Sequence, residues 1–307
     1  LVMAWGATFV IFGLTPTNIL RTEGLAVQSM IASMTGTGIN IILNPIFIFT
    51  CGWGAAGSAL ATVTSMVISD IIMIYYTHYR SKKLTTSIKE TKISRRLQWE
   101  IYAIGIPASI TNLMATFATA LTNRYLISHG APSVAAMGIA LKISLVTNMI
   151  VAGLAFGAQP LIGYNYGAKD QRRFQETIRF DLLVVAGFAF IATIALIIFA
   201  PVLIRLFMND PVVIREGTSM IRWLSSSATL AGVILVFTTM FQSMGKASPA
   251  FWLSFCRQGL IFAVVIIVLH ALFGYTGILA AQPAADLLTF TLALWLNKRY
   301  QPHFDQK

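Results

Sequence analysis

Long apolar runs separated by short hydrophilic breaks constrain this chain more than any other feature. A helix that crosses a bilayer needs about 20 mostly apolar residues. Nine stretches fit that requirement: residues 2–20, 27–49, 55–78, 100–127, 133–162, 177–207, 217–242, 248–272 and 275–297. Only 11% of the residues are charged, whereas soluble globular domains have about 25%. We therefore predict an all-α integral membrane protein with nine transmembrane helices in contact with the lipid bilayer.

The basic residues gather in the hydrophilic breaks, on one side of the predicted membrane. Breaks on that side hold sixteen Lys and Arg residues, whereas the opposite breaks hold Arg124, Arg205 and Arg215, with Arg222 close by. Because cytoplasmic loops are enriched in Lys and Arg, the rich side is predicted to be cytoplasmic, which places the C-terminus inside and residue 1 outside. This distribution also argues against nucleic-acid binding as the explanation for the net charge of +11.

The longest break, residues 80–98, divides the chain. It holds seven basic residues and one acid, Glu90. We predict a three-helix part at 1–79, a basic cytoplasmic linker at 80–98, a six-helix bundle at 99–297 and a cytoplasmic tail at 298–307.

An internal repeat relates the two parts. RTEG at 21–24 corresponds to QSMG at 242–245, and GSALATVTS from Gly57 corresponds to GILAAQPAAD from Gly277, with offsets of 221 and 220 residues. An even number of crossings separates the copies, so the repeat is parallel, with its axis along the membrane normal. Six helices in the second half imply six in the first, so three further helices are expected upstream of Leu1.

Polar residues recur at helical spacing within several predicted spans. The clearest stripe lies in 100–127 and contains Ser109, Asn112, Thr116, Thr119 and Asn123. Small polar residues can join neighbouring helices by hydrogen bonds, or they can line a water-filled cavity. We favour a shared cavity and take Asn112, Thr116, Thr119 and Asn123 as its candidate lining.

Several charged residues lie inside the predicted spans. Arg257 and Asp286 are expected to form a buried pair with a structural role. Lys142 and Asp181 are expected to extend toward an interface, and Asp70 is expected to lie at one.

The sequence gives little support for an enzyme. The histidines lie at helix ends or in the tail, and Cys51 and Cys256 have no metal-site spacing. With no nucleophile-and-base arrangement and no phosphate-loop motif, we predict neither catalysis nor a cofactor.

Several motifs together resemble the multidrug and toxic compound extrusion (MATE) family. They are NIILNPIFIF (40–49), GWGAAGSALATVTS (52–65), GAQPLIGYNYGAKD (157–170) and PAAD (283–286), with the turns LRTEG (20–24) and SMGKAS (243–248). The resemblance implies two six-helix bundles, of which this chain would supply helices four to twelve. It further implies a monomeric multi-pass antiporter of the bacterial inner (plasma) membrane. Such a protein exports cationic or amphipathic drugs (xenobiotics) in exchange for Na⁺ or H⁺ by alternating access.

The resemblance also implies a cation site at Asn40, Asn44 and Thr62. Family members with this site have an Asp where this chain has Asn44. An amide oxygen can bind Na⁺ but cannot exchange a proton, so proton coupling would need an acid from elsewhere. A second family position for an acid corresponds to Ala115. Two alternatives stay open: an inert truncated membrane fragment, and a lipid-linked oligosaccharide flippase of the same broad superfamily.

Overall fold

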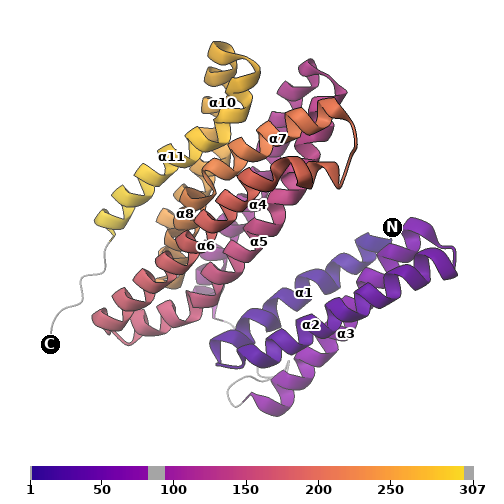
Figure 1. Ribbon diagram of the computed structural model, residues 1–307. Helices are drawn as coiled ribbons and strands as arrows, with labels where there is room; N and C mark the ends of the chain where they lie inside the picture. The colour runs from indigo at the N-terminus through magenta and orange to yellow at the C-terminus, as the bar shows by residue number, and fades with distance from the viewer. Residues whose placement is uncertain (1, 82–93, 301–307) are drawn as a thin grey trace. The chain divides into compact units, whose positions relative to one another are not determined.

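The structure is a computed structural model that describes residues 2–81 and 94–300. Figure 1 shows its helices. The chain divides into two compact units, Leu1–Ser94 and Arg95–Lys307. Most of the predicted linker bases, at positions 82–93, and the end of the predicted tail, at 301–307, lie outside the described residues.

The first unit contains three helices. They are α1 (Val2–Thr22), α2 (Ala26–Pro45) with its π-helical continuation η1 (Ile46–Thr50), and α3 (Gly54–Arg80). Helix α3 packs against both α1 and α2. Gly36 allows the close approach of α2 to α3, since a Cβ added there would lie 2.8 Å from the Cβ of Ser69.

The second unit contains the remaining helices. They are α4 (Arg95–Leu126), η3 (Ile127–His129), α5 (Ala131–Gly167), α6 (Gln171–Arg205), α7 (Pro211–Ser226), α8 (Ala228–Ser243), α9 (Ala247–Phe255), η4 (Cys256–Leu260), α10 (Ile261–Phe273) and α11 (Tyr275–Arg299). Helices α9, η4 and α10 follow one another without a break and form one long helix with a π-helical segment in its middle.

Eight of the nine predicted spans correspond to one helix or to a continuous series of helices, and the span predicted at 217–242 is divided between α7 and α8 with a break at Ser227. Among the described residues, six helices are long and apolar enough to cross a membrane, or seven if the bent pair α7 and α8 is counted as one span. Helices α1 and α4 are not among them, so their status as spans stays a prediction.

The two copies of the repeat share turn geometry. Gly24 and Gly245 have φ of +86° and +70°, in the left-handed region that favours glycine. After each of them the next amide N–H donates to the carbonyl five residues earlier, with a distance of 2.9 Å in both copies. Gly54, the first residue of α3, and Gly274, the residue before α11, also have positive φ. The glycines of the predicted repeat therefore occupy equivalent backbone positions.

Candidate functional site

A polar cluster joins α2 and α3 in the first unit. The amide nitrogen of Asn40 donates to Ser65 Oγ at 3.0 Å and lies 3.5 Å from Thr62 Oγ1. Asn44 Nδ2 donates to Asn40 Oδ1 at 2.9 Å. The three residues of the expected cation site, Asn40, Asn44 and Thr62, are therefore brought together, with Ser65 as a fourth member.

Local backbone geometry places these side chains. Asn40 and Asn44 are four residues apart on α2, so they share one face. The next residue is Pro45, and the chain then continues as a π-helix. At the start of α3, a Cβ on Gly57 would lie 2.6 Å from the carbonyl oxygen of Phe47. This close contact holds the start of α3 against the end of α2 and sets Thr62 opposite Asn40.

The cluster is rich in oxygen atoms. Thr62 donates its hydroxyl proton to Ser58 O at 3.0 Å, and Ser65 donates to carbonyls of its own helix. The hydroxyl oxygens of both residues can still accept, and all the amide and hydroxyl oxygens are neutral. Oxygen ligands of this kind suit hard cations.

A second polar cluster surrounds Asp286 in the second unit. Its carboxylate accepts from Arg257 Nε at 2.8 Å, from Gln282 Nε2 at 3.1 Å and from Ser227 Oγ at 2.6 Å. Asp286 is 1% exposed. The expected pair of Arg257 with Asp286 therefore forms, and two neutral donors complete it.

A cavity of about 440 Å³ adjoins this pair inside the second unit. Arg257, Gln282 and Asp286 lie in its wall, together with residues from all six predicted spans of that unit. Of the predicted α4 stripe, Thr119 lines the cavity and Asn112, Thr116 and Asn123 do not. The hydroxyls of Thr116 and Thr119 donate to carbonyls of their own helix.

Helix α5 supplies polar residues that the sequence analysis did not place in a cavity. Lys142, Ser144 and Asn148 all line it, and they are joined there by Ser225 of α7. The buried hydroxyls of Ser144 and Ser225 have no hydrogen-bond partner in the described part of the chain. Ser144 and Asn148 are four residues apart and share one face of α5, a spacing that could have indicated part of this lining.

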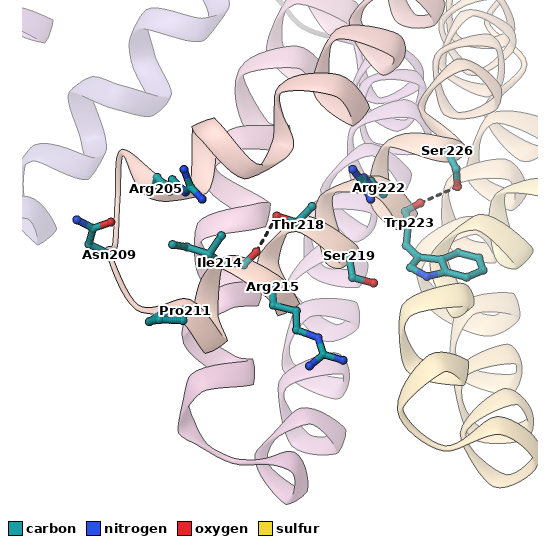
Figure 2. Close-up of a pocket in the computed structure, with 10 residues that line it drawn as sticks. All are labelled: Arg205, Asn209, Pro211, Ile214, Arg215, Thr218, Ser219, Arg222, Trp223 and Ser226. Carbon is teal, nitrogen blue, oxygen red and sulfur yellow. Dashed lines mark hydrogen bonds between the residues drawn. The ribbon is translucent and has the colours of Figure 1, made fainter.

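A groove of about 850 Å³ lies along α7 and the end of α6 (Figure 2). Three arginines line it, Arg205 from α6 with Arg215 and Arg222 from α7. The other lining residues are Asn209, Pro211, Ile214, Thr218, Ser219, Trp223 and Ser226.

Two acids that were predicted at a membrane interface, Asp70 and Asp181, have side chains that are buried in the protein. Asp70 is 5% exposed and its carboxylate lies beside Gly13 of α1, and Asp181 is 4% exposed. One oxygen of each has no hydrogen-bond partner among the described residues. Their predicted depth in the membrane stays a prediction, and neighbouring helices rather than solvent surround both carboxylates.

Comparison with protein families is decisive for the class of this protein. The MatE family model matches residues 107–276, which is more than half of the chain. This chain belongs to the MATE family. It is therefore a multi-pass membrane protein of a transporter family, a class without enzymes.

Curated MATE relatives include multidrug export proteins. "Multidrug export protein MepA" of Staphylococcus haemolyticus (strain JCSC1435) is 28% identical over 288 residues, covering 94% of this chain and 63% of the relative. The protein of the same name from Staphylococcus aureus (strain N315) is 29% identical over 293 residues, covering 95% and 64%. This chain thus spans less than two thirds of the length of these relatives.

Solved MATE structures share the fold. An outward-facing multidrug resistance MATE family transporter superposes with a TM-score of 0.91 at 24% identity, covering 97% of this chain and 68% of that one. A MOP superfamily transporter from Pyrococcus furiosus gives 0.90 at 25% identity, with the same coverage. These scores support the helical arrangement described above.

Proposed function

We propose that the protein is a secondary active antiporter that exports cationic or amphipathic drugs in exchange for Na⁺ or H⁺. Three features support this proposal. The chain belongs to the MATE family, its curated relatives are named multidrug export proteins, and its first unit holds an oxygen-rich cluster where the family resemblance implies a cation site.

The cluster of Asn40, Asn44 and Thr62 carries the proposal. Its amide and hydroxyl oxygens can replace water around a small cation, and their position on two facing helices allows one ion to hold α2 and α3 together. Ion binding would then favour one arrangement of the helices over another, which is what coupling of an ion to transport requires.

The chemistry of this cluster favours Na⁺ over H⁺ as its ligand. None of Asn40, Asn44, Thr62 and Ser65 gains or loses a proton near neutral pH. We propose that proton coupling, if the protein uses it, depends on an acid outside this cluster. In alternating access one repeat moves relative to the other around a central binding site, and the cavity lined by Lys142 and Arg257 gives the second bundle a polar interior for such a role.

Efflux measurements test the proposal. The protein, expressed from its complete gene, should lower ethidium accumulation in cells that lack their own exporters. In proteoliposomes, separate Na⁺ and H⁺ gradients identify the coupling ion. Asn40→Ala and Thr62→Ala should each slow efflux about tenfold or more, since each removes an oxygen ligand. Thr77→Ala is the matched control, because Thr77 lies on the same helix as Thr62 and, among the described residues, its hydroxyl bonds only to Met73 O, at 2.9 Å.

Two results would contradict different parts of the proposal. Unchanged ethidium accumulation on expression would count against drug export. Normal efflux in both the Asn40 and Thr62 variants would remove the cation site from the mechanism and leave the export activity standing.

A further inference from the structure

The groove along α7 and the end of α6, called the arginine groove below, has no role in the proposed antiport. Arg205, Arg215 and Arg222 line one open groove (Figure 2), and each guanidinium carries five N–H donors. Arg222 Nε is 3.5 Å from the carbonyl oxygen of Ile197. No ion pair within residues 2–81 and 94–300 involves any of the three.

Nearby acids do not neutralise the groove. The ten described residues that line it include no Asp or Glu. Asp210 precedes α7 and is used as its N-cap, with Oδ1 accepting from the amides of Val212 and Val213 at 2.8 and 3.2 Å. Glu216 is half-buried on another face of α7. Three positive charges therefore face an open space without a local counter-charge.

Helix packing holds the backbone positions of the three arginines. The face of α7 with Val213, Gly217 and Met220 is buried, and the opposite face carries Arg215, Ser219 and Arg222. A Cβ on Gly217 would lie 2.7 Å from Cδ1 of Ile204, so α6 and α7 are in close contact where Arg205 ends its helix. The groove is thus held by two packed helices.

The length of α6 indicates that the Arg205 end of the groove lies at the depth of the lipid headgroups. Helix α6 has 35 residues and is about 52 Å long at 1.5 Å per residue, whereas the hydrocarbon core of a bilayer is about 30 Å thick. Its last residue, Arg205, therefore reaches a headgroup region. Trp223, which is 38% exposed in the groove, is of the residue type enriched at that depth.

Apolar residues beside the groove favour a lipid over a free anion as its ligand. Leu206 and Phe207 directly follow Arg205 and are 76% and 57% exposed, and Val212, at the start of α7, is 51% exposed. A free phosphate ion would use only the arginines, whereas a phospholipid would place its phosphate on the guanidinium groups and its acyl chains on these apolar side chains.

We propose that this groove binds the headgroup phosphate of an anionic phospholipid. Binding there would link the end of α6 to α7, because the three arginines come from these two helices. The groove shares no lining residue with the cation cluster or with the cavity beside Asp286.

The test measures lipid retention by native mass spectrometry. The full protein is reconstituted in nanodiscs of equal parts phosphatidylcholine and phosphatidylglycerol and then released from them. Wild type should retain one phosphatidylglycerol molecule in preference to phosphatidylcholine. The combined variant Arg205→Gln, Arg215→Gln and Arg222→Gln should lose it, with affinity about fivefold weaker for each arginine removed.

A variant with the same loss of charge is the control. Arg172→Gln, Arg173→Gln and Arg179→Gln removes three exposed arginines from the opposite end of α6, where Arg172 pairs with Glu176 at 2.9 Å and Arg173 with Asp170 at 3.5 Å. This variant should retain the lipid. Equal loss from both triple variants would overturn the proposal, since it would show a response to net charge only.

Two further arms complete the experiment. If the triple variant does not fold, Arg215→Gln and Arg215→Lys are used instead, and the lysine variant should bind more weakly than wild type because it cannot make a bidentate contact. Inorganic phosphate should not displace the bound phosphatidylglycerol. Displacement by phosphate alone, or no preference of wild type for phosphatidylglycerol, would contradict a lipid site.

Discussion

Asp286 is a buried carboxylate, and both of its oxygens have hydrogen-bond partners. Arg257, Gln282 and Ser227 satisfy both carboxylate oxygens. The repeat offset aligns Arg257 with Gly36, the residue that lets α2 approach α3 in the first unit. In the second copy this position is an arginine that lies in a π-helical segment and pairs with Asp286.

Breaking this pair should destabilise the protein. Arg257→Ala leaves Asp286 buried without its cation, which typically costs about 3–5 kcal/mol of unfolding free energy. The double variant Arg257→Leu with Asp286→Leu should recover much of that loss, because neither charge is then buried alone. Denaturation in detergent micelles measures both values. Arg124→Ala is the control, since Arg124 is exposed on α4 of the same unit; an equal loss there would contradict this account.

At the scale of the element, one type of glycine contact recurs in both copies. Gly57 packs on the carbonyl of Phe47, and Gly277 packs still more closely on the carbonyl of Leu269. In each copy the helix turns back on the one before it, and only a residue without a Cβ allows the two backbones to meet.

Gly277→Ala should therefore destabilise the α10–α11 hairpin. The added methyl group would overlap a backbone carbonyl that cannot rotate away, so we expect a loss of roughly 1–3 kcal/mol, as for overpacked cores. Gly138→Ala is the matched control, because nothing lies within 4 Å of a Cβ added at this position in α5. That change should be neutral or stabilise by roughly 0.5–1 kcal/mol. Equal melting temperatures for the two variants would refute the packing argument.

At the scale of the whole molecule, the asymmetry of basic residues leads to a proposal for orientation. The turn after α5 carries Lys169, and α6 then begins with Arg172 and Arg173, whereas the turn between α6 and α7 contains Asn209. These turns lie at opposite ends of α6, so they face opposite sides of the membrane. We propose that the basic end is cytoplasmic and that the C-terminus lies on the same side.

Cysteine labelling checks this orientation. Cys51 is exposed and is first replaced by Ser, while Cys256 is buried and can remain. In intact cells, a membrane-impermeant maleimide should label Asn209→Cys and should label Lys169→Cys only after permeabilisation. The reverse pattern would show that the charge asymmetry does not set the topology of this protein.

Most helix positions, the parallel repeat and the family could be predicted from the sequence alone, whereas the break between α7 and α8 could not. The lengths of the apolar runs and the placement of the charges reflect the surrounding membrane, and the glycine positions reflect the local backbone conformation. Each of these requirements acts on one segment at a time. The turns at Gly24 and Gly245 follow from such local requirements.

Which polar side chains meet depends on how the helices pack against one another. Periodicity placed Asn112 and Thr119 on one face of α4, but only Thr119 lines the cavity, because a face is a property of one helix and a cavity belongs to several. For the same reason the burial of Asp70 and Asp181, and the polar lining around Lys142, could not be read from their own helices. The contact of Asn40 with Thr62 likewise depended on the packing of α2 against α3.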